Sequence, residues 1–446
     1  MISATHNRRR AASAPVGSAL AVALALVVAV ALAVPPPAPA ADPAASAAGP
    51  DRAFATPVAR GSAAARTAIS AGPLRKGLKR ALERAGGRSG AWVMDAASGR
   101  VLFASGAGRR LPLASNTQVF VTAAAIARFG PDERLRTAIW AGDDFEDGVV
   151  GRGLFLRGAG DPTLSSRDLR KLAGRVAAAG VKRVQGPLFY DDSFLDRRDG
   201  VPQRGIVRER VGTLSALTLD GGWSRAPERL AASRLSDALR KAGVGIGRKV
   251  KRRVAPAKSA GAVRVALVSS PRIADLARLT NTPSDNFLAE MLLKDLAGEF
   301  AGRGSTRAGI RLVKKFAARR GSSFHGENGS GLSRVDRASP AAVGALLRSM
   351  LADDTTPEQR VREAFVQSLA VAGRSGTLAS RMRGSAAAGR CAAKTGTLIG
   401  TSALSGYCFR ANGQATVFSI LNDRVNTNRA RAAQDRMAAL IARYAP

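Results

Sequence analysis

The chain has 446 residues, 46% of them hydrophobic, and a formal net charge of +36 at pH 7. A chain of this length buries a sizeable core and accommodates two or three domains, which excludes a mini-protein that needs disulfides or metals to fold. Its two cysteines have no histidine near them and do not make a structural zinc site, which needs four ligands.

Residues 1–41 are typical of a targeting segment. Arg8–Arg10 precede an uncharged Ala/Val/Leu run from about Val16 to Val34, and Ala38-Pro39-Ala40 provides a small-residue cleavage site. The alternative is an uncleaved signal anchor, because the apolar run is just long enough to span a bilayer. Either interpretation predicts an exported protein that is extracellular, periplasmic or held in the cell wall.

The charge does not come from the targeting segment, since removing Arg8–Arg10 still leaves +33. A strongly basic surface favours an anionic partner, and for an exported protein we expect anionic wall polymers. A coding bias toward arginine is the alternative explanation. Nucleic acid is disfavoured because the longest basic cluster, Arg248–Arg253, lacks the interleaved aromatic residues on which bases stack.

The remaining elements predict one α/β domain, residues 72–136 and 269–446, interrupted by a β-rich insertion at 137–268. A linker of Ala, Pro, Ser and Gly spans residues 42–71. In chain order we expect a helix at Leu74–Ala85, a hairpin over Ala91–Ala104, a buried helix at Ser115–Phe129, helices at Ile273–Leu279, Phe287–Leu296 and Thr306–Ala318, strands at Cys391–Leu398, Ala403–Phe409 and Ala415–Leu421, and a helix at Arg429–Tyr444.

Cys391 and Cys408 flank the segment that contains Lys394-Thr395-Gly396. If that segment opens a hairpin that turns near Ile399-Gly400, the two thiols lie opposite each other on neighbouring strands. In an oxidising compartment this geometry favours a disulfide. The alternative is two separately buried free thiols.

Histidine is nearly absent from the chain. His6 falls in the targeting segment, which leaves His325 alone. A Ser-His-Asp or Cys-His mechanism is therefore disfavoured, and a hydrolase built from this sequence is expected to activate its nucleophile by a serine/lysine route.

Three short motifs occur in the order that this route requires. Ser115-Asn116-Thr117-Gln118 lies at a predicted helix start, Ser284-Asp285-Asn286 opens the next helix region, and Lys394-Thr395-Gly396 lies on a predicted strand. Ser-x-x-Lys, Ser-Asp-Asn and Lys-Thr-Gly are the signature of penicillin-binding proteins and class A β-lactamases. Taken alone, the middle motif is also explained as a helix cap.

With these motifs, the chain resembles the class C low-molecular-mass penicillin-binding proteins, the D-alanyl-D-alanine carboxypeptidase/endopeptidase family. Family-like phrases also occur at 156–164, 186–194, 284–294, 329–333 and 394–398. The resemblance implies an antiparallel sheet flanked by helices, with a large insertion that class A β-lactamases lack. It also implies peptidoglycan stem peptides as substrate, β-lactams as inhibitors and no cofactor or metal.

The resemblance assigns roles to individual residues. Ser115 is the nucleophile at a helix start, and its N–H forms the oxyanion hole with the N–H of Thr397. Lys394 and Thr395 bind the terminal carboxylate, and Gly396 admits the peptide backbone. Ser284 relays protons to the leaving group and Asn286 holds the substrate amide.

Gln118 departs from the family pattern. The family has a lysine here, three residues after the serine and on the same helix face. A carboxamide cannot accept the serine proton, and general base catalysis contributes about 10²- to 10⁴-fold. Lys394 is the nearby lysine that could replace the base, but this role requires a lowered pKa and conflicts with binding a carboxylate, which favours the charged form. Three hypotheses follow: a carboxypeptidase/endopeptidase with slow turnover, a peptidoglycan-binding pseudoenzyme, or a basic polyanion-binding protein.

Overall fold

The computed structural model describes residues 68–196, 211–256, 261–351 and 356–446. The predicted targeting segment and most of the predicted linker lie outside these ranges. Within the described ranges, no helix is both long and apolar enough to cross a membrane.

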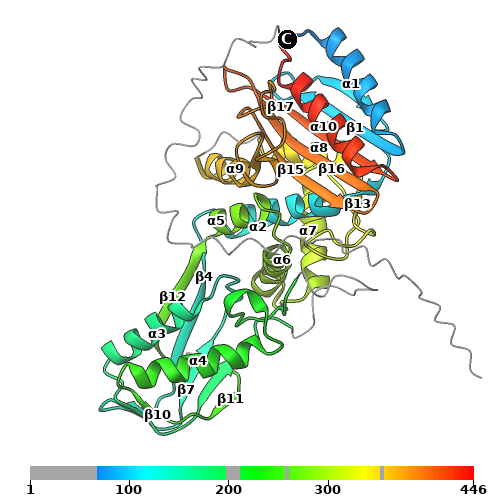
Figure 1. The fold of residues 1–446 in the computed structure, drawn as a ribbon. Coiled ribbons are helices and arrows are strands. Elements are labelled where there is room, and N and C mark those ends of the chain that lie inside the picture. The colour runs from blue at the N-terminus through cyan, green and yellow to red at the C-terminus, as the bar shows by residue number, and fades with distance from the viewer. Residues whose placement is uncertain (1–67, 197–210, 257–260, 352–355) are drawn as a thin grey trace, which may run out of the picture. The chain divides into compact units, whose positions relative to one another are not determined.

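A six-stranded antiparallel sheet lies in the upper part of the view in Figure 1. Its strand order is β14-β15-β16-β17-β1-β2, so strands from both ends of the chain meet where β17 pairs with β1. This confirms the predicted fold class, an antiparallel sheet between helices. The strands are β1 (Arg88–Asp95), β2 (Val101–Ser105), β14 (Ala370–Val371), β15 (Cys391–Leu398), β16 (Thr401–Phe409) and β17 (Ala415–Asp423).

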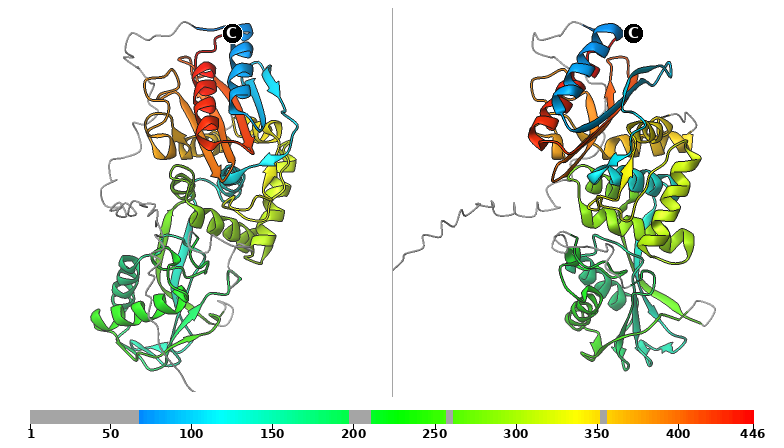
Figure 2. Two further views of the ribbon diagram at one scale, coloured as in Figure 1. Left: turned by 45° about the vertical axis from the view of Figure 1, so that its right-hand side comes forward. Right: turned by 90° about the vertical axis from the view of Figure 1, so that its right-hand side faces the viewer.

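Helices cover both faces of this sheet (Figure 2). One face carries α1 (Ala71–Ala85) and α10 (Thr427–Ile441), whose apolar residues pack into one core cluster with Val93 and Phe418. The other face carries α2 (Thr117–Phe129) and α8 (Pro340–Ser349), which share a second core cluster with Tyr407 and Val417. The central strands are therefore buried on both sides, which explains their nearly continuous apolar sequence.

The helical region around α2 contains elements that the sequence analysis did not predict, α8 and α9, beside three that it did. The elements of this region are η3 (Ala114–Asn116), α5 (Ile273–Asn281), α6 (Asn286–Ala301), α7 (Thr306–Arg319), α9 (Thr356–Ser368), η7 (Gly376–Leu378) and the paired short strands β3 (Leu111–Pro112) and β13 (Arg337–Ala338).

The segment between residues 134 and 272 forms two further sheets, β11-β9-β7-β4-β12 and β10-β8-β6-β5. Unlike the predicted β-rich insertion, it also contains two helices, α3 and α4, whose buried leucines pack against the strands. Its elements are β4 (Arg134–Ala141), β5 (Phe145–Glu146), β6 (Val149–Val150), β7 (Leu154–Arg157), α3 (Ser166–Ala178), β8 (Arg183–Val184), β9 (Leu188–Asp191), η5 (Asp220–Gly222), α4 (Pro227–Lys241), β10 (Gly245–Ile246), β11 (Val250–Arg252) and β12 (Val263–Arg272).

The hairpin of β15 and β16 carries both cysteines. Cys391 is the direct cross-strand partner of Cys408, and a disulfide joins them with the sulfur atoms 2.04 Å apart. Both side chains are buried in the core on the α10 side of the sheet. The disulfide therefore links β15, the strand that carries Lys394, to β16.

Candidate active site

Ser115 lies in the 3-10 turn η3, directly before α2. Ala114, the preceding residue, has a φ of 47°, a left-handed conformation that costs a non-glycine residue about 1 to 2 kcal/mol. Backbone strain of this kind persists where the surroundings enforce it, and it clusters at functional sites. Ser115 is half-buried, and its hydroxyl forms no hydrogen bond within the described part of the chain.

Two glycines hold this strained turn in place by close approach. A Cβ at Gly331 would lie 1.9 Å from the carbonyl oxygen of Ala114, and a Cβ at Gly396 would lie 2.7 Å from that of Leu113. Packing therefore requires a glycine at position 396, in addition to the substrate access predicted from the sequence, because β15 packs directly against the segment before Ser115. Asn116 adds a direct link, since its Nδ2 donates to the carbonyl oxygen of Lys394 at 3.1 Å.

Lys394 is fully buried and points at the Ser284 motif. Its Nζ donates to Ser284 Oγ at 2.7 Å and to the carbonyl oxygen of Thr395 at 2.9 Å. Burial lowers the pKa of Lys394 from 10.5 to about 7, because the buried site disfavours the charged form. At neutral pH a large fraction of this amine is therefore unprotonated and able to accept a proton.

Ser284 and its two neighbours divide their roles. Ser284 has a φ of 68°, so the turn before α6 is strained where its hydroxyl meets Lys394. Asp285 is the helix cap, with its carboxylate accepting from the N–H of Leu288 at 2.8 Å. The cap interpretation of this motif therefore applies to Asp285, while Ser284 and Asn286 face the other two motifs.

Gln118 is completely buried at the position of the family lysine. Its Nε2 donates to Asn286 Oδ1 at 3.1 Å and to the carbonyl oxygen of Ser330 at 3.2 Å. Its Oε1 is buried without a hydrogen-bond partner within the described residues. The carboxamide thus orients Asn286 through a neutral contact and supplies no base.

A buried glutamate shapes the loop that contacts Gln118. Glu290 Oε1 accepts from the N–H groups of Gly329 and Ser330 at 3.0 and 2.8 Å. Burial raises the pKa of Glu290 above its ordinary value. Because Glu290 lies one helical turn after Asn286, a single helix, α6, fixes both the Asn286 side chain and the Ser330 carbonyl.

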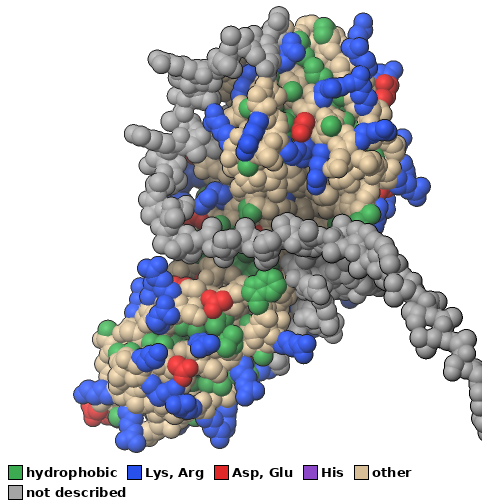
Figure 3. Space-filling model, in the orientation of Figure 1, with side chains coloured by type: hydrophobic (Ala, Val, Ile, Leu, Met, Phe, Trp, Pro, Cys, Tyr) green, Lys and Arg blue, Asp and Glu red, His purple; other side chains and the backbone are tan. Residues whose placement is uncertain are grey.

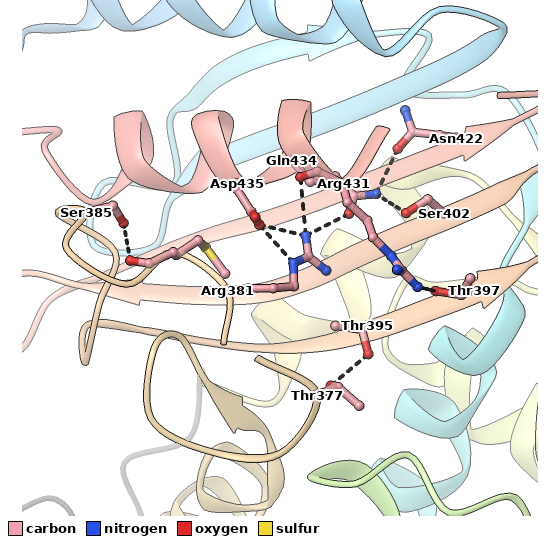
Figure 4. Close-up of polar contacts among 11 residues, drawn as sticks. Thr377, Arg381, Ser385, Thr395, Thr397, Ser402, Asn422, Arg431, Gln434 and Asp435 are labelled. Atoms are coloured by element: carbon pink, nitrogen blue, oxygen red, sulfur yellow. Dashed lines mark hydrogen bonds and ion pairs between the residues drawn. The ribbon is translucent and has the colours of Figure 1, made fainter. Parts of the chain in front are cut away.

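The end of β15 presents two hydroxyl groups, from Thr395 and Thr397. Thr395 Oγ1 donates to Thr377 Oγ1 at 2.8 Å, and Arg431 on α10 donates from Nη2 to Thr397 Oγ1 at 3.0 Å (Figure 4). Thr397 is exposed, whereas Thr395 is buried. The site therefore runs from the buried Lys394 to an exposed threonine beside an arginine.

Comparison with known proteins agrees with this geometry. The chain matches the D-Ala-D-Ala carboxypeptidase 3 (S13) family over residues 76–223 and 216–444. It belongs to the S13 family. A D-alanyl-D-alanine carboxypeptidase of an Actinomadura species is 30% identical over 81% of this chain and 82% of its own length. Carboxypeptidase DacB of Mycolicibacterium smegmatis is 29% identical over 78% of this chain and 79% of its own length.

A solved structure shares the S13 chain's fold. Penicillin binding protein 4 (dacB) of Haemophilus influenzae has a TM-score of 0.69 and 18% sequence identity, covering 81% of this chain and 97% of its own. The predicted class of protein, a low-molecular-mass penicillin-binding protein of the serine peptidase type, is confirmed.

In this S13 chain, the three sequence motifs meet through the contacts between Gln118 and Asn286 and between Lys394 and Ser284.

Three further residues were not singled out from the sequence: Glu290, Thr377 and Arg431. Glu290 had a detectable signal, since a glutamate one turn after the motif asparagine shares its helix face. Thr377 and Arg431 had none, because their contacts join segments far apart in the chain. The role of the Thr397 N–H in an oxyanion hole stays a prediction.

No cluster of three or more metal-binding side chains occurs among the residues that the structure describes.

Proposed function

We propose that this chain is a serine-type D-Ala-D-Ala carboxypeptidase/endopeptidase that acts on peptidoglycan stem peptides through an acyl-enzyme on Ser115. The contact between the buried amine of Lys394 and Ser284 Oγ at 2.7 Å carries the proposal. It provides a proton acceptor in a site whose Ser-x-x-Lys motif ends in Gln118. The activities of the similar carboxypeptidases support the substrate class.

The reaction proceeds in two balanced steps. Ser115 Oγ attacks the carbonyl carbon of the penultimate D-Ala, its proton passes through Ser284 to Lys394, and the oxyanion is stabilised by N–H groups. The C–N bond then breaks as the same proton returns to the leaving amine, releasing D-Ala. Water attacks the acyl-enzyme in the second step by the same route, which restores the Ser115 hydroxyl.

A second candidate function rests on Gln118. Its hydrogen bonds to Asn286 and to the Ser330 carbonyl hold Asn286 in a neutral, ordered contact, which suits a protein that binds peptidoglycan peptides without turning them over. The family match does not support the third hypothesis, a basic polyanion-binding protein, as the main function of the chain.

One experiment separates the two candidates. The purified protein is incubated with a fluorescent penicillin, the adduct is located by intact mass and peptide mapping, and D-Ala release from a synthetic stem peptide is measured in parallel. The peptidase proposal predicts an adduct on Ser115 and D-Ala release, both lost in Ser115→Ala. Peptide binding without either product would support the pseudoenzyme.

We further propose that the protein works outside the cytoplasm and is attracted to anionic wall polymers. Lys and Arg side chains are spread over the visible face and are not gathered in one patch (Figure 3). This distribution suits a diffuse, polyanionic surrounding better than a single docked partner. The targeting segment predicted at residues 1–41 supports the same location.

A further inference from the structure

Arg431 projects from α10 beside the end of the Lys-Thr-Gly strand. Its Nη2 donates to Thr397 Oγ1 at 3.0 Å, and Figure 4 shows the side chain extending from the helix toward that threonine. Within the described part of the chain no carboxylate forms an ion pair with Arg431. Asp435, one turn further along the helix, is instead paired with Arg381. The guanidinium therefore retains donors for an anionic ligand.

Hydrogen bonds of neighbouring residues hold the part of α10 from which the Arg431 side chain projects. Gln434 donates from Nε2 to Ser402 Oγ at 3.0 Å and to Asn422 Oδ1 at 2.9 Å, which ties α10 to β16 and β17. Arg381 donates to the Asp435 carboxylate and to the backbone oxygen of Arg431. These contacts do not involve the Arg431 guanidinium, so truncating its side chain leaves the helix anchored.

The strand geometry aligns Arg431 with the hydroxyl groups on β15. Alternate residues of a strand share a face, so Thr395 and Thr397 lie on one face while Lys394 and Gly396 lie on the other. A carboxylate beside Thr395 and Thr397 would meet the guanidinium, and arginine binds carboxylates with charge-assisted hydrogen bonds.

The same arrangement resolves a conflict in the role of Lys394. A carboxylate bound next to a lysine favours the charged ammonium, whereas a proton acceptor must be neutral. A second cation that carries the carboxylate charge removes this conflict. The planar guanidinium of an arginine matches the geometry of a carboxylate, so Arg431 is suited to that task.

We propose that Arg431, with the Thr395 and Thr397 hydroxyls, binds the terminal carboxylate of the substrate and leaves Lys394 free to accept the Ser115 proton. The proposal rests on the proposed peptidase function and adds a specificity role to it: Arg431 selects peptides that end in a free carboxylate.

The test measures binding separately from turnover. In the Ser115→Ala background, calorimetry gives the affinity for an acetylated peptide ending in D-Ala-D-Ala and for the same peptide as its C-terminal amide. Arg431→Ala is expected to weaken binding of the free acid on the order of 10- to 100-fold, the loss typical of a charged hydrogen bond. Binding of the amide should be unchanged, and Arg431→Lys should recover part of the loss.

Arg436→Ala is the matched control. Arg436 is exposed on the same helix and lines a separate surface hollow between α1 and α10. Its replacement by alanine removes the same single positive charge as Arg431→Ala. It should leave both affinities unchanged. Equal binding of acid and amide by the Arg431-containing protein, or equal loss for both peptides in Arg431→Ala, would overturn the proposal.

The outcome also separates this inference from the proposed function. If Arg431→Ala binds both peptides normally while the protein with Ser115 intact still forms the penicillin adduct and releases D-Ala, only the role of Arg431 fails. If the Ser115→Ala protein binds neither peptide and the intact protein releases no D-Ala, the peptidase function fails and the role of Arg431 fails with it.

Discussion

Gln118 lies among acceptors that would suit a lysine. Its Nε2 faces Asn286 Oδ1 and the Ser330 carbonyl, and an ammonium at this place would donate to both. Because residues three apart on a helix are neighbours, the new Nζ would also lie near Ser115. The surroundings of position 118 therefore suit a lysine, which this chain does not have there.

Gln118→Lys is expected to accelerate penicillin acylation of Ser115 by up to about 10²-fold, because an amine beside Ser115 would take its proton directly and not through Ser284. Stopped-flow or gel-based labelling measures the rate. Gln118→Lys combined with Ser115→Ala should give no adduct, and Gln118→Met, which is neutral and of similar size, should give no acceleration. An unchanged rate in a folded Gln118→Lys protein would show that an amine at position 118 does not reach the Ser115 hydroxyl, and would contradict this prediction.

The pH profile tests Lys394 directly. Burial lowers its pKa to about 7, and only the neutral amine accepts a proton. The acylation rate of the unmodified protein is therefore expected to rise as pH increases through about 7 and to level off above it. In Lys394→Arg the new guanidinium stays protonated, so the acylation rate of this variant should be low at every pH and should not rise through pH 7. A rate that is flat between pH 5 and 9 would contradict a role for Lys394 as base.

At the scale of single elements, α6 connects the site to the 134–272 segment. Asp295, one turn of α6 beyond Met291, is completely buried, and a Cβ at Gly160 would lie 1.9 Å from its Oδ1. Burial, together with the nearby charge of Asp161, raises the pKa of Asp295 well above 3.8. Burial also raises the pKa of Asp161 to about 6. Ionisation of both Asp161 and Asp295 therefore lowers the free energy of unfolding.

Asp295→Asn tests this cost. A carboxyl whose folded-state pKa is raised binds more protons in the folded than in the unfolded state, so its contribution to stability falls as pH rises above about 4. Asparagine cannot ionise, so the variant should gain stability over the unmodified protein as pH increases from about 4 to 8. Urea unfolding at pH 4.5, 6 and 8 measures the difference. A constant difference across that range would show that folding does not raise the pKa of Asp295, and would contradict the prediction.

The same scale shows what the sequence predicted well. The strands β15 and β17 and the helices α2, α6 and α7 were predicted to within a few residues because their periodicity is continuous and glycine or polar residues bound them. The helices α3 and α4 were missed because the short strands around them dominate the local pattern. For the site, the three motifs are contiguous in sequence, whereas Arg431 reaches Thr397 only through the packing of α10 on the sheet.

At the scale of the whole molecule, the charge of +36 predicts salt-sensitive attachment. Exposed charges are screened within roughly 8 to 10 Å at physiological salt, so binding to isolated cell wall should weaken steeply between low and high sodium chloride. A pull-down with purified wall, repeated after removal of anionic polymers, measures it. Binding that does not change with salt would favour coding bias as the origin of the arginines.

The six-stranded sheet also constrains the order in which parts of the protein fold. β1 pairs with β17, so that Arg88 lies opposite Asp423, and neither strand has its full set of neighbours until nearly the entire chain exists. Contacts between such distant segments form late, since loop closure must precede them. A growing or truncated chain therefore carries the Ser115 motif long before β15 is held beside it. The contact between Lys394 and Ser284 therefore forms only when almost the whole chain is available to fold.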